Sequence, residues 1–420
     1  MSNSAPVGDT LPADAVTGLA AFRHRDFRLF FIGKFLALTS FHMILVAIAY
    51  QVYELTGDPM DLAYIGLAMF GPAIGFALIT GYVADRFNRK VVLASCYGLM
   101  LIAALLFYLL TIIGLSVTWP VYAILVILGT GRAFYFATSN ALLPNLVPLG
   151  EFSNAVAWNT TSNKTAQIVG PAGGGLLYLW GPEIVYATAS VIFVFATATT
   201  ALIQTRTHRE GKEPISFETL FAGLHYVWEK KIVLGAISLD LFVVLMGGVT
   251  ALLPVYAKDI LEVGASGAGF LRSAMAAGGV ITALMLTRIN MTHGVGRILF
   301  GCVTLFGLAT IVFGVSEWYL LSLAAMATLG AADMVSVIIR NTLLQIATPD
   351  DKRGRVSAVN SVFVGASNEI GEFRAGVMAA WLGAVPAVVI GGVGSIVIAG
   401  LFWKLFPELV RVNRLDRSLW

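Results

Sequence analysis

Long apolar stretches alternate with short polar connections along almost all of the 420 residues. Each stretch has about 20 residues, which as a helix spans a hydrocarbon core of roughly 30 Å. Membrane strands would need only about 10 residues and would alternate apolar with polar positions, so continuous runs indicate helices. The pattern predicts an all-α membrane protein with twelve transmembrane helices, over residues 28–52, 61–84, 91–114, 119–142, 154–178, 183–203, 234–256, 266–287, 296–315, 318–343, 357–381 and 384–405.

Composition points the same way. Apolar residues make up 58% of the chain and charged residues only 12%, whereas a soluble domain has roughly 45–50% apolar residues. The first 22 residues are small and polar and lack the regions of a cleavable signal peptide, so we expect a disordered tail at residues 1–22. Cys96 and Cys302 fall inside predicted helices, and we expect buried thiols rather than a disulfide or a metal site.

Basic residues of the connections gather on one side of the predicted membrane. If the N-terminus is cytoplasmic, the inner connections hold nearly all of the loop Lys and Arg, while the outer loops hold only Lys258. The outer loops carry acidic residues instead: Glu54, Asp58, Glu183, Asp259, Glu262 and Glu317. We therefore expect both termini in the cytoplasm of a bacterial cell, with the protein in its cytoplasmic (inner) membrane. The net charge of +3 reflects this topology and is no sign of nucleic-acid binding.

The longest inner connection, residues 204–233, divides the chain into two bundles of six helices, over residues 23–203 and 234–405, followed by a cytoplasmic tail at 406–420. The connection includes a predicted amphipathic helix, whose apolar face holds Phe217, Leu220, Phe221, Leu224 and Trp228. The two halves also repeat: NALLPNLVPLGEFSNAVAWN begins at Asn140 and NTLLQIATPDDKRGRVSAVN at Asn341, an offset of 201 residues. Such repeats are typical of transporters built from two related bundles.

A charged stretch, GYVADRFNRK at residues 81–90, separates the second and third predicted helices. It resembles the loop at this position in the major facilitator superfamily, and the matching residues are Gly81, Asp85, Arg86, Arg89 and Lys90. The resemblance implies that Gly81 allows close helix approach and that Asp85 sits against the positive N-terminal end of the eleventh helix, holding the cytoplasmic side shut. The alternative is a basic membrane anchor, which accounts for the basic residues but not for Gly81 and Asp85.

The fifth predicted helix contains VGPAGGG, with Gly170, Pro171, Gly174 and Gly175. This resembles a signature of proton-coupled drug exporters of the same superfamily, although Ala157 and Ala166 replace its two upstream glycines. Physically, the small residues permit close helix packing and Pro171 removes one backbone hydrogen bond. Ordinary glycine-mediated packing is the alternative. The stretches LLQIATPDDKRGRVSAVNSVF and FPELVRVNRL also look like those of bacterial exporters of the enterobactin-exporter and macrolide-efflux type.

Charged residues inside the predicted helices are candidates for substrate or proton binding, because a charge at mid-bilayer costs at least about 2.5–3.5 kcal/mol unless it is paired or faces water. Lys34 and Asp240 each lie about six residues into the first and seventh helices, and the resemblance to the superfamily implies that these two helices are related by symmetry and line a central cavity. We expect them to form a salt bridge near the cytoplasmic end when the outer side is open. Alternatively, Lys34 extends to the inner interface and Asp240 pairs within its own bundle.

Arg132 and Asp333 are related by the same 201-residue offset. The resemblance to the superfamily implies that their helices line a central cavity, so the two charges are expected to face each other across it. Arg132 would attract an anionic group, and Asp333 would take up a proton when substrate displaces the neighbouring cation; a static structural pair is the alternative. Glu369 and Glu372 share a helix face, where two close carboxylates make a usable proton site, with an internal ion-pair network as the alternative. Lys164 would add positive potential if it faces the cavity.

No phosphate loop, nucleotide fingerprint, metal cluster or catalytic triad occurs in the sequence, so we expect neither an enzyme nor a cofactor. The resemblance and the charges predict a monomeric secondary transporter working by alternating access. It would export a small amphipathic or anionic compound, either a siderophore-like metabolite or a drug, in exchange for protons. The alternatives are multidrug efflux without a dedicated metabolite, proton-coupled uptake and, from another class, a receptor or scaffold that binds a ligand without moving it.

Overall fold

The computed structural model describes residues 18–115, 117–205, 224–288 and 293–413, and helices are the regular secondary structure of that part of the chain. The first half of the chain, up to residue 205, contains seven numbered α-helices: α1 Arg25–Thr56, α2 Pro59–Gly75, α3 Ala77–Arg86, α4 Arg89–Ile113, α5 Trp119–Leu142, α6 Phe152–Leu177 and α7 Pro182–Ala201.

The second half, from residue 224, has the same plan. Its helices are α9 Lys231–Gly247, η5 Val249–Leu252, α10 Leu253–Val255, the π-helix η6 Tyr256–Ile260, α11 Gly264–Leu286, α12 Val295–Val315, α13 Tyr319–Ile346, α14 Asp350–Leu382, α15 Ala384–Leu405 and α16 Pro407–Val410. Short 3-10 turns flank the helices of the first half: η1 Ala20–Arg23, η2 Leu143–Asn145, η3 Leu149–Glu151 and η4 Tyr178–Trp180.

Nine helical segments of the described chain are long and apolar enough to cross a membrane. The other three expected spans are also helical but fall short for two different reasons. The second is interrupted, since α2 ends at Gly75 and α3 begins at Ala77; Pro72 inside α2 lacks the N–H that would continue the helical ladder. The fifth and eleventh, α6 and α14, are long enough but more polar. These three segments all line the central cavity described below.

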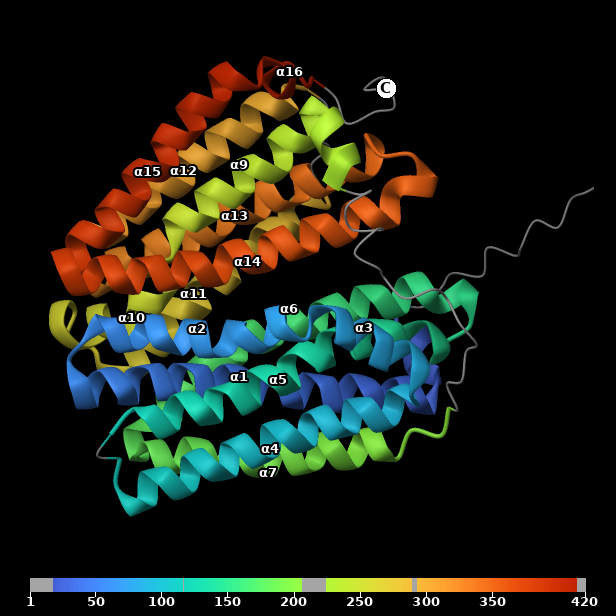
Figure 1. Ribbon diagram of the computed structural model, residues 1–420, viewed down its shortest axis with the longest axis vertical. Helices are drawn as coiled ribbons and strands as arrows, with labels where there is room; N and C mark the ends of the chain where they lie inside the picture. Colours follow the sequence, from blue (N-terminus) through green and yellow to red (C-terminus); the bar gives the residue numbers. More distant parts are fainter. Residues whose placement is uncertain (1–17, 116, 206–223, 289–292, 414–420) are drawn as a thin grey trace, which may run out of the picture.

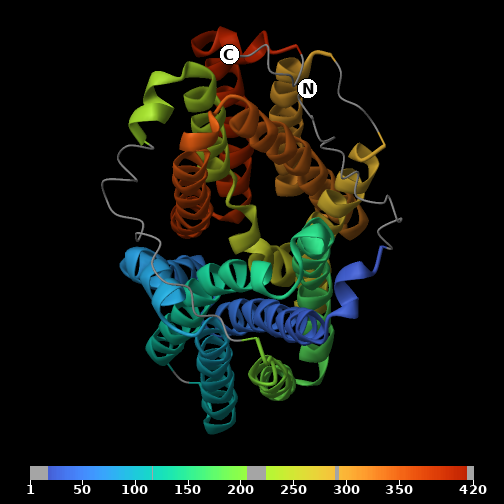
Figure 2. The ribbon, with the colours of Figure 1, turned by 90° about the vertical axis from the view of Figure 1, so that its right-hand side faces the viewer.

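The helices form two bundles that touch along two seams, α2 against α14 and α6 against α11. Figure 1 shows the bundles meeting at one end of the molecule and diverging at the other, and Figure 2 looks onto the end where they diverge. We call the diverging end, where α3 ends at Arg86 and α13 at Ile346, the motif end. The end where α1 ends at Thr56 and η6 at Ile260 is the far end.

One apolar cluster fills the first bundle and continues into the second half, where it includes Leu252 and Tyr256. Within the first bundle, Phe107 and Tyr186 stack with ring centroids 5.4 Å apart and both are fully buried. A second cluster lies wholly within the second bundle, where Leu299 and Phe300 of α12 pack with Phe402 of α15. Contacts within each bundle still outnumber those between them, so each bundle can hold together as a unit.

Two predicted segments differ from expectation or lie outside the description. Residues 20–22, assigned above to a disordered tail, form most of η1 instead, with Ala21 buried and Phe22 packed edge-on against Trp158 at 5.1 Å between ring centroids. An aromatic contact with α6 gives this segment enough buried area to be ordered. Of the predicted amphipathic helix, residues 217–223 lie outside the described residues; positions 224–229 are helical, and Trp228 is exposed.

Candidate functional site

A cavity of about 380 Å³ lies between the two bundles, roughly midway along the helices. Its wall is shared by α1, α2, α5 and α6 of the first half and by η5, α11, α13 and α14 of the second. Polar side chains in the wall are His42, Arg132, Lys164, Gln167, Thr250, Arg272, Asp333, Asn368, Glu369 and Glu372. Five of the seven predicted substrate or proton candidates therefore line it; Lys34 and Asp240 do not.

An ion pair between Arg132 and Glu369 crosses the cavity and joins the two halves. Arg132 Nη1 donates to Glu369 Oε1 at 2.9 Å, and the Arg132 side chain is 45% exposed whereas that of Glu369 is 14% exposed. The Arg132 guanidinium also lies over the Phe41 ring, 5.6 Å from its centroid. The sequence placed Arg132 opposite Asp333; both line the cavity, but the carboxylate that Arg132 binds is that of Glu369.

Glu372 lies on the same face of α14 as Glu369, as their spacing predicts. Its Oε1 accepts a hydrogen bond from Thr250 Oγ1 at 2.6 Å, which ties α14 to η5. Arg374, two residues after Glu372 on α14, does not pair with either glutamate: it donates to the Met246 carbonyl and to Met378 Sδ. The two glutamates thus have different partners, one in each half of the molecule.

Asp333 and Asp240 belong to a second cluster of charges on the second half. Asp240 of α9 forms a buried ion pair with Arg340 of α13, with side chains 8% and 4% exposed. Asp333, about two turns before Arg340 on the same helix, lies within electrostatic range of this pair and of Lys164. The Asp333 carboxylate lines the cavity, and the buried Asp240–Arg340 pair lies close to it. A carboxylate in this position can take up or release a proton from the cavity.

The predicted bridge between Lys34 and Asp240 is not formed in this conformation. Both side chains are described and each has another partner: Lys34 donates to Asn159 Oδ1 of α6, and Asp240 pairs with Arg340. Each of these contacts stays within one half of the molecule. The physical reason is proximity, since a partner on a neighbouring helix of the same bundle is available whatever the separation of the bundles.

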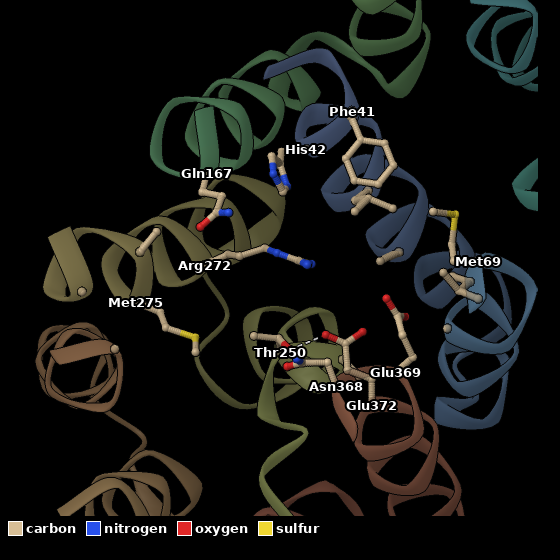
Figure 3. A pocket seen from close by; sticks show the side chains of 18 of the residues that line it. Phe41, His42, Met69, Gln167, Thr250, Arg272, Met275, Asn368, Glu369 and Glu372 are labelled. Carbon is tan, nitrogen blue, oxygen red and sulfur yellow. Dashed lines mark hydrogen bonds between the residues drawn. The ribbon is translucent and has the colours of Figure 1, made fainter. Parts of the chain in front are cut away.

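A group of polar side chains faces the glutamates from the other side of the cavity. Figure 3 shows His42, Gln167 and Arg272 on one side and Thr250, Asn368, Glu369 and Glu372 on the other. Lys164, three residues before Gln167 on α6, also lines the cavity. The sequence alone did not say whether its side chain faces the cavity or the lipid. The sequence analysis did not identify His42, Gln167 or Thr250 as candidates. Spacing from Lys164 could have found Gln167, and a histidine in an apolar span is itself a signal.

The stretch GYVADRFNRK lies at the motif end, and its basic residues bond to backbone carbonyls within the first half. Arg89 donates to the Ala141 carbonyl at 2.9 Å and to Asn145 Oδ1 at 3.2 Å, and Lys90 donates to the Ile203 carbonyl at 2.7 Å. These carbonyls lie at helix C-terminal ends, where cations are favoured. Arg86 is exposed and bonds to the Tyr82 hydroxyl.

The remaining two motif residues bear on the predicted gate. The side chain of Asp85 lies outside the described part of the structure, as do those of Asp350 and Asp351 at the start of α14, so the expected contact between Asp85 and that helix end stays a prediction. A Cβ atom built on Gly81 would meet nothing within 4 Å. The Cβ direction of Gly81 therefore meets no described neighbour in this conformation.

The glycines of α6 lie where helices come closest. A Cβ atom at Gly170 would lie 2.6 Å from His42 Cβ, and one at Gly174 would lie 2.8 Å from Met43 Cα, so both positions seat α6 against α1. A Cβ atom at Gly175 would lie 2.6 Å from the carbonyl oxygen of Ala265 in α11. Pro171 is buried, and its carbonyl contacts Gly269 of α11. The motif therefore packs α6 both within its own half and across to the other half.

The far end is closed by contacts between α1 and the π-helix η6. The Tyr53 hydroxyl bonds to the Asp259 carboxylate, and Lys258 Nζ donates to the Glu54 carbonyl at 3.2 Å. Lys258 also lies over the Tyr53 ring, 5.4 Å from its centroid. We call Tyr53, Glu54, Lys258 and Asp259 the far-end latch. Lys258, the basic residue that the sequence placed in an outer loop, is thus used to join the two halves.

Comparisons with known proteins agree with this architecture. A family described as "Transmembrane secretion effector" matches residues 16–417. The "Enterobactin exporter EntS" of Escherichia coli O1:K1 / APEC is 25% identical over 403 residues, which cover 93% of this chain and 94% of that protein.

Solved structures of transporters share the fold. A variant of the "peptide transporter POT" has a TM-score of 0.73 with 12% identity, over 93% of this chain and 96% of that one. A "Bacterial Homolog to Human Lysosomal Transporter, Spinster", in an inward-facing, unoccupied conformation, has a TM-score of 0.69 with 14% identity, over 93% and 98%. The expected fold, with two helical bundles of the major facilitator type, is confirmed, as is the expectation of a transporter rather than an enzyme.

Proposed function

Because this multi-pass membrane transporter belongs to the transmembrane secretion effector family of the major facilitator superfamily, we propose that it exports a small amphipathic or anionic compound in exchange for protons. The motif end faces the cytoplasm in this proposal, since Arg89 and Lys90 are anchored there and basic residues favour the inner side. The described conformation is then open to the cytoplasm and closed at the far end.

The observation that carries the proposal is the ion pair between Arg132 and Glu369. An ionised Glu369 bonds to Arg132 and ties the two halves across the cavity at 2.9 Å. Protonation of Glu369 removes the charge on which the pair depends, so that one half is released from the other. Glu372, three residues away, favours such a step because two ionised carboxylates on one helix face repel each other. Proton binding can thereby bias the balance between the two conformations.

The substrate is proposed to be a siderophore-like metabolite. Similarity to an enterobactin exporter supports this, and so does a cavity that carries Lys164, Arg272 and His42 besides the paired Arg132. The test compares, by mass spectrometry, the medium and the cell extract of the source organism with and without the gene, under iron shortage. A chelator that is lost from the medium of the strain without the gene, and accumulates inside those cells, supports the proposal. Unchanged pools in both compartments refute the siderophore assignment.

Drug export is the second candidate. Met69, Met275 and Met334 line the same cavity, and methionine side chains adapt to ligands of different shape. A drug-susceptibility panel on the same pair of strains tests this function: loss of the gene should lower tolerance to several chemically unrelated compounds.

Proton coupling is tested with the purified protein in liposomes that hold a pH-sensitive dye. Once a substrate is identified, its addition should move protons through the wild-type protein, and Glu369→Gln should strongly reduce that movement, because glutamine has no carboxyl group that can take up a proton. Glu317→Gln, an exposed glutamate outside the cavity, is the matched control. Unreduced proton movement in Glu369→Gln would rule out this carboxylate. Ligand binding with no proton movement in the wild type would favour a receptor.

A further inference from the structure

The cavity has one wall on which positive and hydrogen-bonding groups gather. Lys164 and Gln167 come from α6, His42 from α1 and Arg272 from α11, and Figure 3 shows three of them opposite Glu369 and Glu372. We call these four residues the basic wall. They derive from both halves of the molecule, since α11 belongs to the second half, so a ligand bound here would contact both bundles.

Most other charges of the cavity already have partners. Glu369 is bound by Arg132, and Glu372 accepts from Thr250. On the basic wall the situation is reversed: within the described residues no hydrogen bond or ion pair reaches the side chains of Arg272, Lys164 or Gln167. His42 Nδ1 is buried without a partner. The charges of Arg272 and Lys164 act on Glu369 and Asp333 only through space. Donors left without a hydrogen-bond partner on one wall of a cavity are suited to a ligand that supplies the missing acceptors.

The basic wall is held in place by its surroundings. Ser273 Oγ, next to Arg272, donates to the carbonyl of Ile168, next to Gln167, at 2.6 Å. Gly170 lets His42 approach α6, because a Cβ atom there would lie 2.6 Å from His42 Cβ. The helices that carry the four residues are therefore fixed against one another before any ligand arrives, which lowers the entropy cost of binding. The glycine motif of α6 gains a specific role here, since it brings His42 to the wall.

We propose that the basic wall is an oxyanion-binding site, in which Arg272 binds a carboxylate or a similar group of the substrate and Lys164 and His42 complete its partners. This inference rests on the proposed function, because it names the substrate class of the same cavity. Arg272 rather than Arg132 takes the anion, since the Arg132 guanidinium is already bonded to Glu369. A guanidinium presents two parallel N–H groups to a planar oxyanion, and partial burial strengthens the contact.

The test measures binding to the purified full chain in lipid nanodiscs, with no pH gradient, by ligand-induced thermal stabilisation. Four small probes share one ring and differ in charge: benzoate, phenyl phosphate, benzamide and benzylamine. The inference expects the two anions to stabilise the protein and the neutral and cationic probes to do so far less. Greater stabilisation by benzoate than by phenyl phosphate identifies a carboxylate site, and greater stabilisation by phenyl phosphate identifies a phosphate site.

Variants locate the binding. Arg272→Gln should weaken the affinity for the more tightly bound anion about tenfold or more. Arg272→Lys should weaken that affinity less, because it keeps a positive charge. Arg288→Gln should bind the anion as tightly as the wild type does. Arg288 is the matched control because it is an exposed arginine just beyond the end of the same helix. If Arg272→Gln does not fold, Lys164→Gln and the comparison of probes on the wild type decide the question.

Equal binding of benzoate and benzamide, no stabilisation by any anion, or full anion affinity in a folded Arg272→Gln protein would each overturn the oxyanion site. Failure of the proposed function gives a different result. Liposomes that carry the wild-type protein would then show no substrate-dependent proton movement, although the purified protein still bound anions through Arg272. The oxyanion site is therefore tested by anion binding, and proton-coupled export by proton movement in liposomes.

Discussion

The two ends of the molecule use polar side chains in opposite ways. At the far end they join the halves: Tyr53 of α1 bonds to Asp259 of η6, and Lys258 donates to the Glu54 carbonyl. At the motif end, the contacts described for its basic residues lie within one half, as those of Arg89 with Ala141 and Asn145 do. Closure of the far end thus depends on specific contacts between bundles, whereas the same kind of side chain at the motif end stabilises a single bundle.

This difference explains why a transporter of this kind can move as two bodies. Contacts such as those of Lys34 with Asn159 and of Asp240 with Arg340 survive any separation of the bundles, because both partners move together. The contacts that must break are those at the far end and the Arg132–Glu369 pair. If the comparison is right, variants at the two ends should affect different properties, stability for bonds within a half and conformational balance for bonds between halves.

The largest effect is expected from Asp240→Asn, which leaves the buried charge of Arg340 without its partner. Removing one member of a buried ion pair costs about 3–5 kcal/mol, so the variant should unfold at a markedly lower temperature or denaturant concentration. Replacing both members, with Asp240→Leu and Arg340→Met, should restore most of the stability. Thermal and chemical unfolding of the purified protein provide the measurement, and Glu317→Gln is the control.

The same variant can also contradict the comparison. If Asp240→Asn is as stable as the wild type but transports poorly, then Asp240 acts in gating, as the predicted bridge to Lys34 would require. A variant with Lys34→Asp and Asp240→Lys together would then be the next measurement, because recovery of transport would show that the two residues meet in another conformation.

An intermediate effect is expected from Gly175→Ala. Its Cβ atom would lie 2.6 Å from the Ala265 carbonyl oxygen across the seam between α6 and α11. Such crowding costs about 1–3 kcal/mol, and because it opposes contact between halves it should shift the protein toward opening of the far end. Gly81→Ala is the matched control, since its Cβ atom meets nothing within 4 Å in this conformation.

Spin labels at Leu55 and Glu262, both exposed near the far end on different halves, would report the change as a longer distance. Gly81→Ala should leave stability unchanged within about 0.5 kcal/mol. Its effect on the balance between conformations is a separate matter. If the motif end closes over Gly81, as the resemblance to the superfamily implies, Gly81→Ala should disfavour that closed state and so favour the described conformation, the opposite of the shift expected for Gly175→Ala. An equal shift in both variants would mean that the glycines act through their own helices and not through the seams.

Sequence could predict the helices because a continuous apolar run of this length has one stable form in a membrane. It could also find Arg132 and Glu369 as candidates, since charges in such runs are costly. It could not predict that these two form a pair. Helical spacing says which residues share a face of one helix, such as Glu369 and Glu372, but not how helices from two bundles are rotated toward each other.

The pairings expected from internal symmetry have the same origin. Symmetry relates Lys34 to Asp240 and Arg132 to Asp333 as positions rather than as contacts, and the bridge between Lys34 and Asp240, expected when the outer side is open, stays a prediction. Local partners such as Asn159 and Arg340 compete for the same side chains, and a contact of about 3 Å is decided by side-chain reach. Residues 20–22 belong to a segment whose small and polar composition predicts disorder, although the packing of Phe22 against Phe27, Phe31 and Trp158 orders it.

The smallest effect is expected at the far-end latch. Tyr53→Phe removes the hydroxyl that bonds to Asp259 but keeps the ring under Lys258. Hydrogen bonds between membrane helices are worth about 0.6–2 kcal/mol, so opening of the far end should become about three- to thirtyfold more favourable. The labels at Leu55 and Glu262 measure this shift. Tyr64→Phe is the control, because the Tyr64 ring contacts Tyr122 within its own half.

Combining the two far-end variants makes the argument sharper. Tyr53→Phe acts on the contact between α1 and η6, and Gly175→Ala on the seam between α6 and α11. If each only weakens the joining of two rigid halves, their effects on the open population should add as free energies, since the sites share no partner. A double variant that opens no further than Gly175→Ala alone would mean that the seam controls closure and that the latch merely follows it.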